Sequence, residues 1–227
     1  MPNHPWPPVP PPTRSPFAAP SQELQEAALA LYRVRAERYD RELAPFEPLR
    51  RLAVARLGLR PGQTVLDLGC GTGLSLPLLH EAVGPGGQVV GVEQCAHMLA
   101  QARQRVDEAG LSGVTLLHAP VEEAPLDGWA DAACFHFTHD ILLSPQALAR
   151  VMRHLRPGAQ VVATGLQWAP AWAWLANCWV YGAAWYSISS LQQLHAPWQL
   201  LAAVVPELVV EPVWQGAVFI AHGRIPG

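Results

Sequence analysis

Short apolar runs alternate with helical spacings of apolar residues along most of the chain. Apolar runs of strand length, typical of strands covered on both faces, occupy residues 64–68, 88–92, 114–118, 131–137 and 160–164. Helices are predicted at residues 21–40 and 48–57, from about residue 75, at 95–109 and from Ser144-Pro145. Strands that alternate with helices form parallel sheets through right-handed crossovers. The pattern therefore predicts an α/β fold.

The end of the chain departs from this alternation. Two apolar segments, 208–214 and 217–222, are separated by Gln215-Gly216, a pair typical of a hairpin turn. We therefore expect an antiparallel pair of strands after the parallel part of the sheet.

The first strand leads into a loop with three glycines at alternate positions. Asp67 stands near the end of the strand, and Gly69, Gly71 and Gly73 follow it. Glycines at this spacing let the backbone turn sharply and approach a ligand where a side chain would block it. Asp67 adds a carboxylate beside the turn. Together these residues predict a site for a nucleoside cofactor that carries an amine or hydroxyls.

The spacing of the glycines separates two classes of cofactor. A dinucleotide fingerprint, G-x-G-x-x-G, needs its third glycine where this chain has Leu74, one residue after Gly73. The D-x-G-x-G-x-G pattern resembles motif I of the class I S-adenosylmethionine (SAM) dependent methyltransferases. The resemblance implies a Rossmann-like doubly wound sheet, mostly parallel with an antiparallel last strand. It also implies SAM as cofactor, held in part by Asp67, Gly69, Cys70, Gly71, Thr72 and Gly73.

The second strand also ends in a carboxylate. Glu93 is placed to accept hydrogen bonds from the 2′- and 3′-hydroxyls of a ribose, a role that serves NAD as well as SAM. Gln94, the next residue in the chain, is also expected to contact the cofactor. In the family that the chain resembles, a methionine one turn into the next helix often packs on the adenine, which here is Met98; a core position is the alternative.

The third strand departs from the family pattern. Many members carry there an Asp that binds the adenine amino group, and the matching residue here is Pro120. The adenine contacts then fall to the backbone of Val121 or to Glu122.

The residues after the fourth strand are the candidates for the chemistry. In the family this strand end, with Phe135, faces the methyl group and the acceptor. Three interpretations stay open: His136 contacts the amino-acid end of SAM, His139 oriented by Asp140 acts as a base, or both histidines satisfy backbone groups. A His-His-Asp metal site is a further alternative, but no other ligand cluster accompanies it, and we expect no metal.

An aromatic residue just ahead of the core completes the expected site. Tyr39-Asp40 resembles the Tyr-Asp that often begins these domains, in which the tyrosine closes over the carboxylate end of the cofactor. An aromatic residue packing on the sheet is the alternative.

A tryptophan-rich apolar segment spans residues 166–206. No Asp, Glu, Lys or Arg occurs from Pro157 to Pro206, and a helix is predicted at 169–186. A helix that is apolar all round is buried, binds lipid or walls an apolar pocket. We favour a lid over the acceptor site. Pro170, Asn177 and Gly182 argue against a free membrane span. A membrane surface is a less favoured alternative, and a homodimer face is another.

Length and composition complete the picture. The chain has 227 residues, and nine of its 23 prolines lie in the first twenty. We expect a disordered proline-rich leader at 1–20 and a single domain at 21–227. A net charge of −3 gives no general attraction to nucleic acid. The four cysteines are widely spaced, as in the reduced thiols of a cytoplasmic protein.

These observations favour a SAM-dependent methyltransferase that acts on a small, apolar or amphiphilic acceptor. The missing adenine-binding Asp and the proline-rich leader motivate one alternative, a non-catalytic binding or scaffold protein of the same fold. A second alternative is an NAD(P)-dependent oxidoreductase, which Leu74 disfavours.

Overall fold

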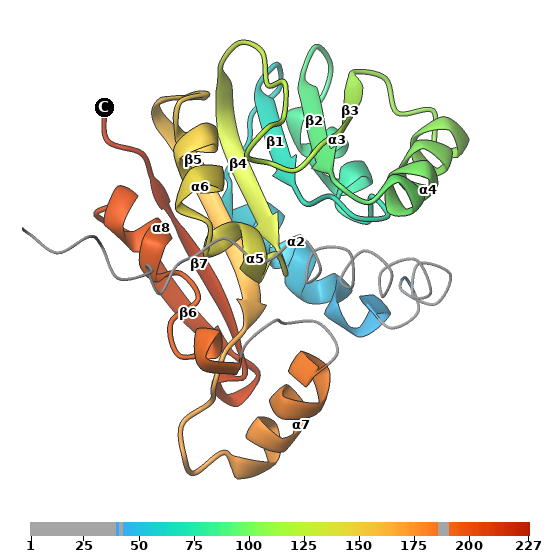
Figure 1. The fold of residues 1–227 in the computed structure, drawn as a ribbon. Helices are drawn as coiled ribbons and strands as arrows, with labels where there is room; N and C mark the ends of the chain where they lie inside the picture. The colour runs from blue at the N-terminus through green and yellow to red at the C-terminus, as the bar shows by residue number, and fades with distance from the viewer. Residues whose placement is uncertain (1–39, 41–42, 186–190) are drawn as a thin grey trace, which may run out of the picture.

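A seven-stranded sheet forms the centre of the protein, which is seen here in a computed structural model that describes residue 40 and residues 43–185 and 191–227. The strands are β1 (Thr64–Leu68), β2 (Gln88–Glu93), β3 (Val114–His118), β4 (Ala130–His136), β5 (Leu155–Leu166), β6 (Val209–Val213) and β7 (Val218–Arg224). Their order is β3-β2-β1-β4-β5-β7-β6 (Figure 1). The first five strands pair in parallel, and β7 is antiparallel to β5 and β6. The predicted fold class is confirmed.

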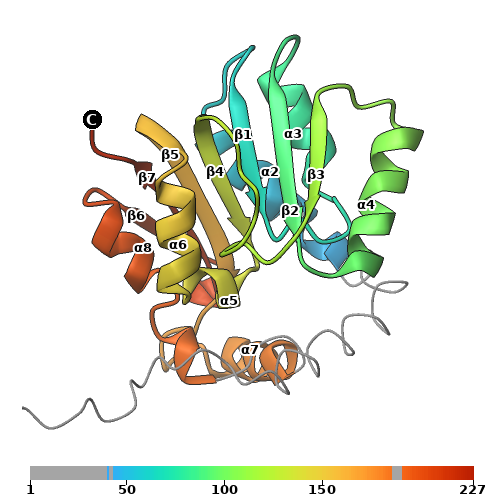
Figure 2. The ribbon, with the colours of Figure 1, turned by 45° about the horizontal axis from the view of Figure 1, so that its top comes forward.

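Helices cover both faces of this sheet, with α2 and α3 on one side and α6 and α8 on the other (Figures 1 and 2). The α-helices are α2 (Glu47–Arg56), α3 (Leu76–Val83), α4 (Ala96–Glu108), α5 (His139–Leu142), α6 (Pro145–Met152), α7 (Trp174–Trp185) and α8 (Gln199–Val204). Short 3₁₀ turns lie at η1 (Ala44–Phe46), η2 (Leu191–Leu194) and η3 (Trp214–Gly216). No helix in the described ranges is long and apolar enough to cross a membrane.

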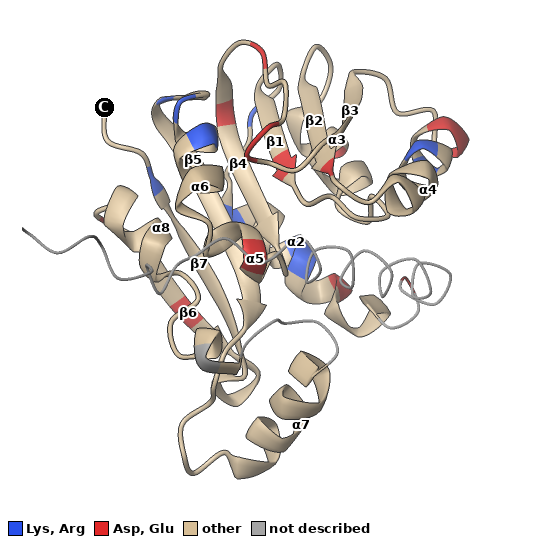
Figure 3. Ribbon diagram, in the orientation of Figure 1, with Lys and Arg blue, Asp and Glu red and all other residues tan. Residues whose placement is uncertain are grey.

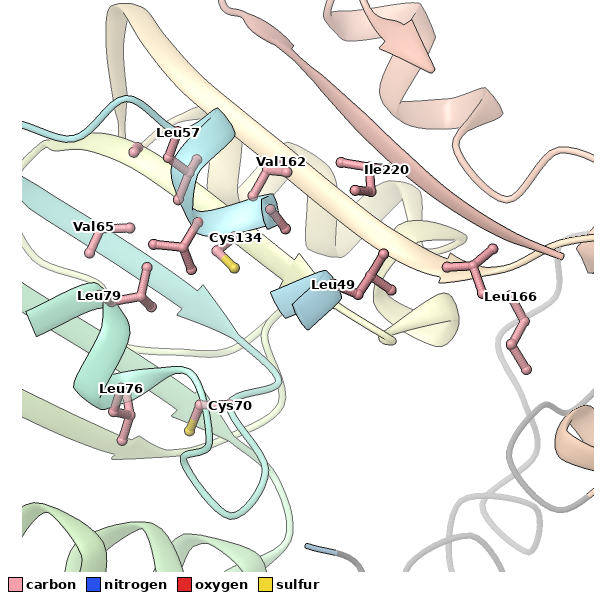
Figure 4. Packing of buried hydrophobic residues seen from close by; sticks show 14 of the residues in the cluster. Leu49, Leu57, Val65, Cys70, Leu76, Leu79, Cys134, Val162, Leu166 and Ile220 are labelled. Atoms are coloured by element: carbon pink, nitrogen blue, oxygen red, sulfur yellow. The ribbon is translucent and has the colours of Figure 1, made fainter. Parts of the chain in front are cut away.

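The two faces of the sheet bury two hydrophobic clusters. One includes Leu49 of α2, Leu79 of α3 and Val65 of β1, and Figure 4 shows Val65 beside Leu79 in this cluster. The other packs α6 and α8 against the opposite face, where Phe135 and Phe219 are fully buried. Because both faces are covered, the parallel strands carry the unbroken apolar runs seen in the sequence.

Most predicted elements are present, and the differences have local causes. β5 begins at Leu155 and not at residue 160, because Leu155 pairs with Ala130 before a register shift in the ladder. The short helices α5 and α8 were not predicted. The predicted helix at 21–40 lies outside the described residues, apart from its last residue.

The helix predicted at 169–186 begins at Trp174. The side chain of Asn177 donates to the carbonyl of Ala169 at 3.1 Å and accepts from its amide at 2.8 Å. These two bonds occupy the backbone N–H and C=O of Ala169 and hold residues 169–173 outside the helix.

Leu79→Ala should lower the free energy of unfolding by about 2–5 kcal/mol, because Leu79 is fully buried between α3 and the sheet. Chemical denaturation measures this change. Leu175→Ala is the matched control: Leu175 is 65% exposed on α7, so its loss should change stability little. Equal losses in both variants would contradict this packing.

Candidate active site

The candidate site lies at the carboxyl ends of the parallel strands. The sheet order reverses between β1 and β4, and ligands of open α/β sheets bind in the crevice outside such a switch point. A pocket with about 350 Å³ of empty space, part of it open to solvent, occurs there. Its lining residues are Leu43, Arg50, Asp67, Gly69, Cys70, Gly71, Thr72, Leu74, Ser75, His136 and Phe137.

The glycine loop lines one side of this pocket in a conformation that only glycine adopts readily. Gly69, Gly71 and Gly73 have φ angles of 74°, 57° and 80°. A side-chain carbon added to Gly69 would lie 2.5 Å from Cγ2 of Thr138, and one added to Gly73 would lie 3.1 Å from Cβ of Ala102. The loop is therefore held between α4 and the end of β4.

Asp67 places a carboxylate in the pocket without a protein partner for one of its oxygens. The residue is 1% exposed, and its Oδ2 atom is buried with no hydrogen-bond partner. Burial raises the pKa of this carboxyl to about 7, while Arg50 lowers it and Glu93 raises it further. A cationic or hydrogen-donating ligand group would satisfy the free oxygen.

Arg50 is the charged residue of this pocket that was not predicted from the sequence; Leu43, Ser75 and Phe137, which also line it, were not predicted either. Arg50 is 5% exposed, lines the pocket from α2 and forms an ion pair with Glu47 at 2.6 Å. A sequence signal was present, because Arg50 shares the buried face of α2 with Leu49, Ala53 and Val54. A guanidinium on an otherwise apolar face is a candidate anion ligand.

His136 turns one ring nitrogen toward the sheet and leaves the other free. Its Nδ1 atom lies 3.0 Å from the hydroxyl of Thr164, and its Nε2 atom is buried without a partner. Burial, aided by the nearby Arg50, lowers the pKa of the imidazole to about 3. The ring is therefore neutral near pH 7, and its Nε2 atom is available for a hydrogen bond in the pocket.

His139 has a different environment from His136. It is 5% exposed, its Nε2 atom donates to the carbonyl of Leu166 at 2.9 Å, and its ring meets Phe219 edge-on. Burial lowers its pKa, and it does not line the pocket. Asp140 is exposed, and no hydrogen bond joins it to His139 among the described contacts. For His139 this geometry favours the interpretation that it satisfies a backbone group.

Glu93 connects the glycine loop to the end of β2. Its carboxylate accepts from the amide of Gly71 at 3.0 Å and from that of Cys95 at 2.7 Å. Burial raises its pKa, and these two amides oppose that shift. Each oxygen keeps a lone pair, which is the acceptor capacity that a pair of ribose hydroxyls requires.

The other expected cofactor contacts have mixed positions. Met98 and Val121 are buried, whereas Gln94 and Glu122 are exposed. The carboxylate of Glu122 accepts from the hydroxyl of Ser144 at 2.6 Å. The side chain of Phe135 is fully buried in the core and is not part of the pocket lining.

Asp40 stabilises the glycine loop through Thr72 and through Arg105 of α4. It accepts from the hydroxyl of Thr72 at 2.6 Å and pairs with Arg105 of α4, whose Nε atom donates to the carbonyl of Thr72 at 3.1 Å. The neighbouring Tyr39, expected to close over the cofactor, lies outside the described residues.

Four aromatic rings continue from the pocket toward α7. Phe137 lines the pocket and meets Phe46 edge-on at 4.9 Å between ring centroids. Phe46 packs on Trp214 at 5.0 Å and on Trp179 at 6.0 Å. Phe137 has a φ of 57°, a strained conformation for a bulky residue that is often found at functional sites. We call Phe46, Phe137, Trp179 and Trp214 the aromatic wall.

The fold and the site together define a nucleoside-cofactor protein of the class I methyltransferase type. A family model described as a methyltransferase domain matches residues 65–158. A solved structure of a SAM-dependent methyltransferase from Aquifex aeolicus superimposes with a TM-score of 0.63 at 23% identity, over 85% of this chain and 98% of that one.

Two curated relatives each match about half of the chain. An uncharacterised 37.1 kDa protein from a Streptomyces fradiae transposon is 39% identical over 49% of this chain and 32% of its own length. A demethylmenaquinone methyltransferase of Listeria welshimeri is 32% identical over 52% of each chain. This chain thus spans about half or less of the length of these relatives. Residues 65–158 thus match a methyltransferase domain, and the relatives and the fold support the class I SAM-dependent type, whose cofactor is SAM.

The residues of the pocket fit that cofactor. The amino-acid end of SAM carries an ammonium and a carboxylate, and the pocket offers the free oxygen of Asp67 and the guanidinium of Arg50. No group of three His, Cys, Asp or Glu side chains within the described part of the chain has metal-binding geometry.

Asp67→Asn should stabilise the cofactor-free protein at pH 8 by up to about 4 kcal/mol, since the buried carboxylate with a pKa of about 7 no longer has to ionise. The pKa is raised on folding, so the carboxyl favours the folded state at low pH and this effect is lost as the pH rises from about 4 to about 7. The gain should therefore disappear near pH 4. Chemical denaturation at both pH values measures it, with the exposed Asp107→Asn as control. A gain that did not depend on pH would contradict the raised pKa.

Proposed function

We propose that this protein transfers a methyl group from SAM to a small, apolar or amphiphilic acceptor. The observation that carries the proposal is the aromatic wall, which begins inside the cofactor pocket at Phe137 and continues to Trp179 of α7. An acceptor held against these rings would lie next to the cofactor and would bury its apolar surface there.

The chemistry requires little from the protein beyond placement. SAM, when bound, supplies a methyl group on a positively charged sulfur, and its transfer needs alignment and the exclusion of water. We assign Asp67 and Arg50 to the amino-acid end of the cofactor and Glu93 to its ribose. These assignments rest on the free Oδ2 atom of Asp67, the buried guanidinium and the carboxylate at the end of β2.

We assign His136 a positioning role. A pKa of about 3 makes its imidazole a weak base near neutral pH, whereas the free Nε2 atom suits a hydrogen bond to the cofactor or the acceptor. We do not assign a proton transfer to His139, because its Nε2 atom already donates to the carbonyl of Leu166.

Calorimetric titration tests the cofactor part of this proposal. The protein should bind SAM and its demethylated product but not NAD. Gly71→Val should abolish SAM binding, because a β-branched residue does not readily adopt the φ of 57° and Gly71 lines the pocket. Gly110→Val also replaces a glycine with positive φ, but at the exposed end of α4, so it controls for backbone strain alone. Binding of SAM by a folded Gly71→Val would refute the loop assignment.

A screen with isotope-labelled SAM over lipid and small-molecule extracts tests the acceptor part, with demethylmenaquinone, the acceptor named in one relative, as the first pure compound. Trp179→Ala should raise the KM for the acceptor at least tenfold and leave the Kd for SAM within about twofold, because Trp179 contacts Phe46 and Trp214 and does not line the cofactor pocket. Trp179→Phe keeps a ring and should retain most of the affinity. SAM binding without methylation of any extract would favour the non-catalytic alternative.

A further inference from the structure

One face of α7 presents large apolar side chains to solvent. Trp174, Leu175, Tyr181 and Trp185 are 63%, 65%, 46% and 64% exposed, and Trp172, just before the helix, is 72% exposed. We call these five residues the outer aromatic face. α7 lies beyond the carboxyl ends of the parallel strands (Figures 1 and 2).

The packing of α7 determines which residues face outward. Val180 and Ala184 of the helix are fully buried in the core, as is Ala173 before it at 4% exposure. The bonds from Asn177 to the backbone of Ala169 anchor the same side. The large aromatic residues are therefore on the outside because the small ones occupy the contact with the core.

The stretch of chain that carries this face is free of charged residues. No Asp, Glu, Lys or Arg occurs between Arg156 and Glu207, a stretch that contains α7 and both of its flanks. Figure 3 shows the charged residues over the rest of the molecule and none on α7. The face could enter a less polar environment without removing a charged group from water.

Two occupants compete for such a face, a second copy of the chain and a lipid surface. The five exposed side chains present roughly 500–700 Å² in total, if each large side chain has about 150–250 Å² of surface. A stable dimer buries about 800 Å² on each partner and surrounds its core with a polar rim. The outer aromatic face falls short of that area, and the stretch of chain between Arg156 and Glu207 supplies no charged residue for a rim.

The side chains of the face match the interfacial region of a bilayer. Four of the five are Trp or Tyr, whose rings combine apolar surface with one polar group and prefer the level of the lipid headgroups. α7 has 12 residues and is about 18 Å long, so it would lie along the surface.

We propose that the outer aromatic face docks the protein on a lipid bilayer, with α7 parallel to the surface and its tryptophan rings among the headgroups. Attachment depends on the burial of apolar side chains in the bilayer and not on charge. The protein therefore binds neutral and anionic membranes equally. This proposal does not depend on the acceptor, because vesicle binding is measured without SAM or methyl transfer.

Cosedimentation of the full chain with phosphatidylcholine vesicles, with and without phosphatidylglycerol, tests the proposal. The protein should partition onto both kinds of vesicle, with less than a twofold change on addition of salt, and the tryptophan emission should shift to the blue. Trp174→Ser/Trp185→Ser should lower the partition coefficient roughly tenfold or more. Circular dichroism confirms that this variant is folded.

Trp129→Ser is the matched control. Trp129 is 57% exposed at the amino end of β4, whereas α7 lies beyond the carboxyl ends of the strands, and replacement of Trp129 should leave partitioning unchanged. No partitioning of the parent chain, an equal loss in Trp129→Ser, or binding only to anionic vesicles would overturn the proposal. Sedimentation velocity identifies the competing occupant: a parent dimer that the double substitution converts to a monomer would assign the face to a second copy.

Discussion

The backbone of the glycine loop is the constraint on which the site depends. The amides of Gly69 and Cys70 both donate to the carbonyl of Val92, so the chain turns back across the end of β2 as soon as it leaves β1. The turn requires positive φ angles, and the close approach of Thr138 and Ala102 leaves no room for side chains. Once the loop is formed, Asp67, Glu93 and the end of β4 come to the same edge of the sheet.

Several polar side chains are buried at that edge, and their burial lowers the stability of the folded protein. Asp67, Arg50 and Glu93 are all nearly inaccessible to solvent, and Asp67 keeps an oxygen without a partner. In the absence of ligand such groups reduce stability, because burial penalises the charged form of each carboxyl. A ligand with matching charges removes part of this penalty. The lower stability of the cofactor-free protein is therefore linked to its affinity for SAM.

α7 gives this methyltransferase domain two apolar surfaces with different neighbours. Trp179 joins Phe46 and Trp214 beside the cofactor pocket, while Trp174, Leu175 and Trp185 face away from the core. An acceptor with apolar character would find rings on both surfaces. The 12 residues of α7 thus contribute side chains both to the proposed acceptor site and to the proposed membrane contact.

The sequence by itself determined the parallel strands and the cofactor loop. Apolar runs located the parallel strands to within a few residues, since strands buried on both faces need no alternation. The spacing of Gly69, Gly71 and Gly73 identified the turn, because glycine adopts the required positive φ angles more readily than other residues. Such features are local, and a local pattern is sufficient to specify them.

Only the tertiary structure decided which side chains enter the site. His136 and His139 are three residues apart, yet one lines the pocket and the other binds the carbonyl of Leu166. Arg50 reaches the pocket because α2 packs on the sheet with that face inward. Because α7 is apolar on every side, the periodicity of its sequence could not show which residues face outward. The smaller Val180 and Ala184 pack against the core, and Trp174 and Trp185 lie on the outside. These outcomes depend on contacts between segments far apart in the chain, which local patterns do not encode.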